Sequence, residues 1–213
     1  MKKILFIEAS PRSEQSLTSN MAKTLIDKLQ SADNWQLDHL NLWKSELPDI
    51  NGDTLNAKYA VFSGAEMTDV QKNNWQKLNE YVEQFAAADL VIIGAPMWNW
   101  GIPYRLKHYV DVITQPQLTF NWTPDDGYVP LLPSRDVVVV TSSGGDYTPG
   151  SGNEHEDFAY RYLGLWLEGC MGCSVEFVHM TMTATGPEGI EKATRDAEQQ
   201  IAEYVRTLSL SAA

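Results

Sequence analysis

Three short stretches of the sequence combine residue types that can bind a small ligand. They are residues 10–18, 96–100 and 142–145. Each follows a short run of β-branched and aliphatic residues, which is typical of a strand buried on both faces of a sheet. Open α/β sheets bind their ligands at the carboxyl ends of such strands. We therefore expect the three stretches to form one site.

The first stretch carries hydroxyl groups ahead of a predicted helix. Ser16 or Thr18 can cap this helix, whose free N–H groups and dipole favour an anion, and Ser10 can add an O–H donor. The stretch lacks both the Gly-x-Gly-x-x-Gly of a dinucleotide site and the Gly-Lys-Ser/Thr of a P-loop. The pattern favours a phosphomonoester held by hydroxyls and amides. The alternative is an ordinary capped helix.

The second and third stretches indicate a planar ligand. Pro96-Met97-Trp98-Asn99-Trp100 offers flat apolar surface and an amide, which suits a heteroaromatic ring with hydrogen-bonding edges. Alternatively, the two tryptophans are core or interface residues. Ser142-Ser143-Gly144-Gly145 lets the backbone approach a ligand, because glycine has no Cβ; a plain turn is the alternative here. The three signals strengthen one another if the fold brings them together.

Hydrophobic periodicity predicts the elements that would do so. Strands are expected at residues 3–9, 35–42, 90–94, 136–141 and 175–180. Helices are expected after Ser16 or Thr18, at residues 55–62, from the capping Asp69 to about 88, and at residues 103–113, 158–167 and 187–208. Alternation of strands and helices predicts an α/β fold with a parallel sheet and right-handed crossovers. The expected strand order is 2-1-3-4-5.

We interpret residues 1–213 as one domain with an aromatic insertion at about residues 115–133. The insertion contains Phe120, Trp122 and Asp125-Asp126-Gly127, and the last of these is a hairpin signal. No internal repeat or linker interrupts the chain.

Composition limits the function classes. The chain has 213 residues and a net charge of -12, which argues against a nucleic-acid or anionic-membrane surface. No apolar run approaches the roughly 20 residues of a membrane helix. Cys170 and Cys173 could form a redox or metal motif, but with no second cysteine pair we interpret them as reduced structural thiols of a cytoplasmic protein. The four histidines are not spaced as a metal site, and we interpret His179 as a core residue.

The sequence resembles the FMN-dependent NADH azoreductases, also called FMN-dependent NADH:quinone oxidoreductases. The resemblance runs along essentially the whole chain. Its motifs are Ala9-Ser10 with Ser16-x-Thr18, Gly94-Ala95-Pro96-Met97-Trp98-Asn99-Trp100, Leu106-Lys107-x-Tyr109-x-Asp111, Phe120-x-Trp122 and Ser143-Gly144-Gly145. It implies a flavodoxin-like three-layer α/β/α sandwich and a homodimer with the active site at the interface.

The resemblance also implies a role for each stretch. FMN phosphate is expected at Ser10 and Ser16-Leu17-Thr18, and the isoalloxazine ring at residues 96–100 and 142–145. Phe120, Trp122 and Tyr147 are expected to line the substrate face, the first two by reaching the partner's flavin.

Two positions depart from the family pattern. The family often has Tyr and Phe where Trp98 and Trp100 stand, which predicts a larger, flatter floor that favours polycyclic quinones. Many members have a His where this chain has Tyr147, and a phenol can donate a hydrogen bond but is not cationic near neutral pH.

The implied reaction is a two-electron ping-pong hydride transfer from NADH or NADPH to a quinone or azo compound. The flavin carries the chemistry, so no catalytic acid–base pair is expected. One alternative is a flavodoxin-type electron carrier. The strong acidity of the chain fits this alternative, but the aromatic insertion does not. Another is a FAD-dependent diaphorase-type quinone reductase. A flavin-free hydrolase or binding module is a third, although the chain lacks a Gly-x-Ser-x-Gly elbow.

Overall fold

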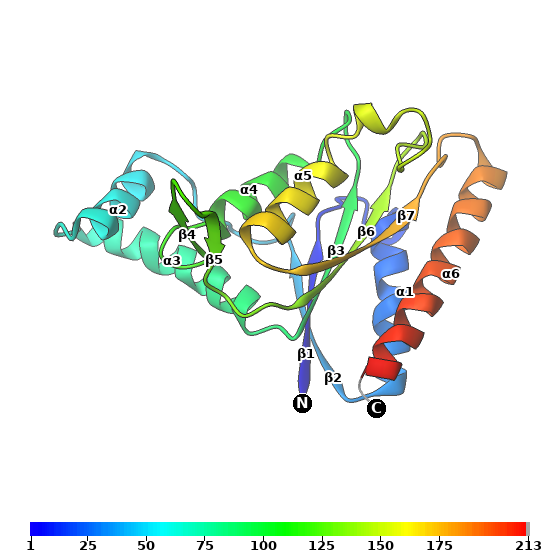
Figure 1. Ribbon diagram of the computed structural model, residues 1–213, viewed down its shortest axis with the longest axis horizontal. Helices are drawn as coiled ribbons and strands as arrows, with labels where there is room; N and C mark the ends of the chain where they lie inside the picture. Colours follow the sequence, from blue (N-terminus) through cyan, green and yellow to red (C-terminus); the bar gives the residue numbers. More distant parts are fainter. Residues whose placement is uncertain (212–213) are drawn as a thin grey trace.

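A central parallel sheet organises the chain in a computed structural model that describes residues 1–211 (Figure 1). Its strands are β1 (Lys2–Glu8), β2 (Trp35–Asn41), β3 (Leu90–Pro96), β6 (Asp136–Ser142) and β7 (Ser174–Met180). Their spatial order is β2-β1-β3-β6-β7. This confirms the predicted order 2-1-3-4-5, because β4 and β5 pair separately as a two-stranded hairpin.

Helices cover both faces of the sheet and complete the three layers. On one face lie α1 (Leu17–Ala32) and α6 (Pro187–Ser211). On the other lie α3 (Asp69–Ala86), α4 (Tyr104–Ile113) and α5 (Tyr160–Gly164), with α2 (Gly52–Ser63) packed against α3 (Figure 1). The flavodoxin-like α/β/α sandwich expected from the sequence is therefore confirmed.

Strand β3 shows why the sheet holds together. Its residues alternate between the two cores: Val91 and Ile93 pack against α3–α5, whereas Leu90 and Ile92 pack against α1 and α6. All four side chains are at most 1% exposed. Full burial of such a side chain stabilises the fold by about 1.5–3 kcal/mol.

The start of α3 differs from the expectation. Thr68, rather than Asp69, is the N-cap, because its hydroxyl accepts a hydrogen bond from the Gln71 N–H at 3.3 Å. The Gln71 side chain accepts in return from the Thr68 N–H at 2.9 Å, which completes a capping box. Asp69 is the first helical residue, where its negative carboxylate interacts favourably with the positive end of the helix dipole. At α1, Ser16 is the cap, and Thr18 is not.

The helix predicted at residues 158–167 is also wrong in part. The buried Asp157 carboxylate accepts from the N–H groups of Ala159 and Tyr160, so α5 begins only at Tyr160. The chain then continues as a π-helical segment, Leu165–Cys170, beyond the predicted end. Pro103 precedes α4 as its N-cap instead of occupying the first helical position.

The aromatic insertion forms the predicted hairpin. Strands β4 (Phe120–Thr123) and β5 (Gly127–Pro130) pair antiparallel. Asp126 N–H donates to the Thr123 hydroxyl at 2.9 Å, and Gly127 has φ +69°, a conformation that glycine adopts without steric cost.

His179 lies in β7 as a satisfied histidine. Its Nδ1 pairs with the Thr141 hydroxyl at 3.1 Å, and its ring stacks on Phe177. Burial lowers the pKa of His179 and outweighs the carboxylates of Asp157 and Asp146, which raise it. The histidine is therefore satisfied, as expected, but it is only half-buried and does not belong to either core.

This burial predicts a loss of stability in mild acid. An unfolded histidine titrates near pH 6.5, whereas the folded chain takes up this proton only at lower pH. We expect the free energy of unfolding to fall as the pH drops below about 6.5 and to level off below the folded pKa. Urea denaturation between pH 7.5 and 5 measures this slope.

The variant His179→Gln isolates the histidine from the carboxylates, which titrate in both proteins. It is expected to flatten the slope in this window, while His155→Gln, at an exposed position, leaves it unchanged. An unaltered slope in His179→Gln would contradict the assignment.

Candidate functional site

The three predicted stretches meet at the carboxyl edge of the sheet. Hydrogen bonds join them directly: Ala9 N–H donates to the Gly94 carbonyl at 3.0 Å, and Met97 N–H donates to the Ser142 carbonyl at 2.8 Å. The in-register pairing of β1, β3 and β6 continues into these bonds. The expectation that the fold brings the stretches together is confirmed.

The first loop presents buried hydroxyl groups at a helix N-terminus. Ser10, Ser16 and Thr18 are at most 3% exposed. Ser16 Oγ accepts from the Ser19 N–H at 3.1 Å and lies 3.2 Å from Thr18 Oγ1. Leu17 and Thr18 are in the first turn of α1, where helix geometry leaves N–H groups without intrahelical acceptors. Amides and hydroxyls can therefore hold an anion here without a positive side chain.

The second loop is a tight turn in a strained conformation. Trp98 N–H donates to the Gly101 carbonyl at 2.8 Å, and Gly101 N–H donates back to Trp98 at 3.0 Å. Asn99 and Trp100 between them have φ of +48° and +64°, as a type I′ turn requires. A left-handed conformation costs a residue such as Trp about 1–2 kcal/mol. Strain of this kind concentrates at functional sites.

The tryptophans of this turn are not core residues. Trp98 is 36% exposed and Trp100 is 51% exposed. Phe158 N–H donates to the Trp100 carbonyl at 3.1 Å, which fixes the turn while its rings stay open. This exposure excludes the core as the place of the two tryptophan side chains, so they belong either to a ligand site or to an interface.

The third loop is held rigidly against the segment that follows β7. Ser143 N–H donates to the Met180 carbonyl at 3.0 Å, and Ser143 Oγ donates to the Gly145 carbonyl at 2.8 Å. A Cβ on Gly145 would lie 3.3 Å from the Tyr147 ring, and one on Gly144 would lie 3.2 Å from Ala184. The glycines therefore permit close packing of the Tyr147 ring and Ala184 against this loop.

A buried tyrosine lies beneath the third loop. Tyr160 is 6% exposed, and its hydroxyl lies beside the Thr141 and Ser143 side chains without a formed hydrogen bond. Burial raises the pKa of Tyr160, so that it stays a neutral phenol. Its hydroxyl is fully buried among these side chains.

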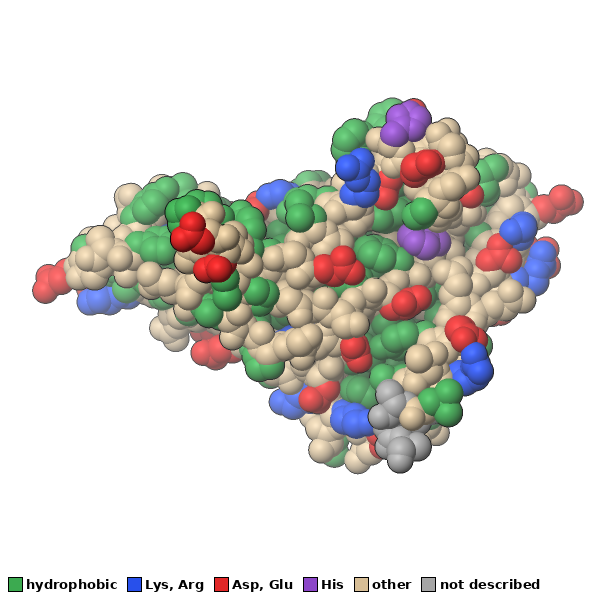
Figure 2. Space-filling model, in the orientation of Figure 1, with side chains coloured by type: hydrophobic (Ala, Val, Ile, Leu, Met, Phe, Trp, Pro, Cys, Tyr) green, Lys and Arg blue, Asp and Glu red, His purple; other side chains and the backbone are tan. Residues whose placement is uncertain are grey.

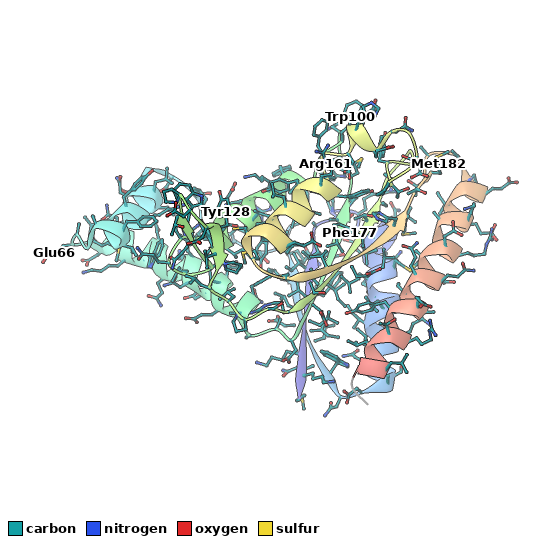
Figure 3. The ribbon with its side chains drawn as sticks, viewed as in Figure 1. Glu66, Trp100, Tyr128, Arg161, Phe177 and Met182 are labelled. Carbon is teal, nitrogen blue, oxygen red and sulfur yellow. The ribbon has the colours of Figure 1, made fainter. Side chains whose placement is uncertain are left out.

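Phe120 and Trp122 do not join the three loops within one chain. They lie on the β4–β5 hairpin, and Figure 3 shows Tyr128 of this hairpin well separated from Trp100. Phe120 instead lines a cavity of about 420 Å³ with Tyr162 and Trp166.

A fourth loop, which follows β2, also reaches this edge of the sheet, although it was not predicted to belong to the site. Trp43 Nε1 donates to the Ala9 carbonyl at 2.9 Å, and its ring centroid lies 5.8 Å from that of Trp98. Arg105 of α4 donates to the carbonyls of Leu42 and Ser45, each at 2.7 Å. An aromatic residue directly after a predicted strand was the available signal, because that position belongs to the same sheet edge.

Three further features of the described residues concern metal ions, thiols and membranes. Residues 1–211 contain no cluster of three or more His, Cys, Asp or Glu side chains able to hold a metal ion. Cys170 and Cys173 are free and buried, and burial raises the pKa of both thiols, that of Cys173 to about 11. None of the described helices is both long and apolar enough to span a bilayer.

Sequence comparisons place these features in a family. A profile for the flavodoxin-like fold matches residues 2–205. An FMN-dependent NADH:quinone oxidoreductase of Ruegeria pomeroyi is 40% identical over 179 residues, which cover 84% of this chain and 88% of the relative. A relative with the same description from Desulfotalea psychrophila is 32% identical over 209 residues, 98% of each chain.

Solved structures agree with this placement. A Bacillus anthracis azoreductase (strain Sterne) superposes with a TM-score of 0.84 at 27% identity, covering 95% of this chain and 98% of its own. An FMN-dependent NADH-azoreductase of B. anthracis in complex with FMN gives a TM-score of 0.83 at 26% identity, with 96% and 99% coverage. The resemblance seen in the sequence is confirmed, and this chain belongs to the FMN-dependent NADH:quinone oxidoreductases of the flavodoxin-like fold.

Proposed function

We propose that this protein is an FMN-dependent oxidoreductase that uses NADH or NADPH to reduce quinones and aromatic azo compounds. The observation that carries the proposal is the meeting of the three loops at one sheet edge, with an anion site at one end and exposed indole rings beside it. Family membership supports the same activity, since relatives are described as FMN-dependent NADH:quinone oxidoreductases.

The residues present fit FMN. Its phosphate would accept hydrogen bonds from the hydroxyls of Ser10, Ser16 and Thr18 and from the first-turn amides, including that of Leu17. These neutral donors can hold the phosphate without a basic side chain, although the chain has a net charge of -12. A monophosphate also fits a site that lacks the glycine pattern of a dinucleotide loop.

The isoalloxazine ring would be held by the other two loops. Pro96, Met97, Trp98, Asn99 and Trp100 supply apolar surface and an amide. Ser142, Ser143, Gly144 and Gly145 supply backbone N–H and carbonyl groups, and the packing of Tyr147 and Ala184 against the two glycines holds these groups in place.

When bound, FMN supplies the two-electron hydride chemistry. The chain's own residues bind and orient the reactants: the exposed rings of Trp98 and Trp100 offer a flat floor, and the phenol of Tyr147 offers a hydrogen-bond donor. Donor and acceptor substrates would use the same place in turn. Because the flavin carries the chemistry, no catalytic acid–base pair is expected.

We further propose a homodimer with the active site at its interface. The cavity lined by Phe120 lies between α2, α4, the hairpin and the π-helical segment, and apolar side chains gather over α2 and the hairpin (Figure 2). Leu55 and Leu165, which line this cavity, are 41% and 73% exposed. A second copy would cover this surface and bring its own Phe120 and Trp122 to the flavin.

We also propose that the chain forms one domain and that the protein is located in the cytoplasm, where its free cysteines stay reduced.

The absorbance spectrum of the purified protein tests the function. We expect the bands of oxidised flavin, rapid bleaching when NADH or NADPH is added without oxygen, and recovery of colour when a quinone follows. Mass spectrometry of the released cofactor should give FMN. Slow or absent bleaching would contradict the enzyme and favour an electron carrier. Release of FAD would favour a diaphorase-type reductase. A colourless protein that does not bind added FMN would favour a flavin-free function.

The double variant Trp98→Ala/Asn99→Ala tests the assignment of the second loop. Loss of the ring packing and the amide hydrogen bond should weaken FMN binding by about 10- to 100-fold. Titration of the apoprotein with FMN, followed by flavin fluorescence, measures this constant. The matched control Asn34→Ala/Trp35→Ala removes the same residue types at the opposite edge of the sheet and should bind normally. Equal affinities for the two variants would overturn the site.

The variant Leu165→Glu tests the dimer. A charge at this exposed cavity position should shift the protein from dimer to monomer in light scattering and lower quinone reduction, because the substrate face would lose the partner's aromatic residues. Leu210→Glu is the matched control, since Leu210 is 71% exposed on α6. A monomeric wild-type protein with full activity would contradict the shared site.

A further inference from the structure

The loop after β2 makes specific contacts with two of the three loops. Trp43 reaches the first loop through its hydrogen bond to the Ala9 carbonyl, directly before Ser10. It reaches the second loop through its ring, which contacts Trp98 at 5.8 Å between centroids. Trp43 therefore lies at the border between the proposed phosphate and ring sites.

Trp43 is also the centre of an aromatic surface. The Tyr104 ring meets it edge to face at 5.2 Å, on the side where α4 begins. Trp98 and Tyr104 are 36% and 64% exposed, and Trp43 is half-buried between them. We call these three rings the aromatic shelf.

The shelf is held rigidly from below. Arg105 binds the carbonyls on both sides of Trp43, at Leu42 and Ser45. The indole N–H of Trp43 is committed to Ala9, so the ring has one orientation. The three rings are not coplanar: Trp98 is tilted by 47° and Tyr104 by 83° from the plane of Trp43. A flat ligand that stacks on one of these rings therefore meets the others at an angle, and because the rings are held in place little freedom is lost on binding.

The hydroxyl of Tyr104 gives the shelf little polarity, and its other exposed surface is aromatic carbon. A planar ligand of a single ring has too little area to cover Trp98 and Trp43 together, because the centroids of these two rings lie 5.8 Å apart. A ligand of several fused or linked rings would extend beyond Trp98. The chemistry of the shelf therefore selects for the size of the planar acceptor.

We propose that Trp43 is a specificity-determining residue that, with Trp98 and Tyr104, binds the part of a polycyclic quinone or aromatic azo compound that extends beyond the flavin ring. The inference rests on the proposed function and adds to it the class of acceptor: planar aromatic compounds of two or more rings.

Steady-state kinetics of Trp43→Leu with two acceptors tests the proposal. Compared between FMN-saturated proteins, the KM for a three-ring anthraquinone should rise by about 3- to 10-fold more than the KM for 1,4-benzoquinone, the size of effect that one aromatic contact produces. Trp43→Phe keeps a ring and should retain most of the preference. Trp35→Leu, at the other end of β2, is the matched control.

Two results would overturn the proposal: an equal rise in KM for both acceptors, which indicates that Trp43 only positions Trp98, or no change in either. If Trp43→Leu does not fold, Tyr104→Leu at a more exposed position takes its place and should show the same selective rise.

Equilibrium binding separates the shelf from the proposed function. An anthraquinone sulfonate should bind the FMN-loaded wild-type protein more tightly than the Trp43→Leu variant, as measured by quenching of tryptophan fluorescence. If the wild-type protein reduces neither quinone, the proposed function fails, yet this difference in affinity would still support the shelf. Equal binding would overturn the shelf while leaving the activity intact.

Discussion

The site depends on hydrogen bonds that continue the sheet past the ends of its strands. Ala9 pairs with Gly94, and Met97 pairs with Ser142, so the loops after β1, β3 and β6 keep the register of the strands. The burial of those strands on both faces fixes that register, because a shift would expose apolar side chains on one core or the other. The packing of the two cores therefore also fixes the positions of the loops.

On this frame, the loops use conformations that are unfavourable in isolation. Asn99 and Trp100 both adopt left-handed backbone, and the surrounding bonds to Gly101 and Phe158 hold them there. The result is a turn whose indole rings point away from the core. A preorganised floor of this kind loses little freedom when a planar ligand binds. Trp43 and Arg105 extend the same principle to the neighbouring loop.

The sequence allowed the strand order and the three loops to be predicted, because β-branched runs and glycine-rich ends are local signals. The prediction of Asp69 as the cap of α3 overlooked the Thr68-x-x-Gln71 capping-box pattern, which the sequence itself contains. The π-helical extension of α5 and the contacts of Trp43 were not predicted, because both depend on packing between segments far apart in the chain. The separation of Phe120 from the loops is equally a property of the fold.

The most direct test of the central claim is a crystal structure of the protein reconstituted with FMN. We expect the FMN phosphate to lie within hydrogen-bonding distance of the Ser16 and Thr18 hydroxyls and of the first-turn amides of α1. We also expect the isoalloxazine ring to lie between residues 96–100 and 142–145. A flavin bound elsewhere, such as in the cavity between α2, α4 and the hairpin, would contradict this claim.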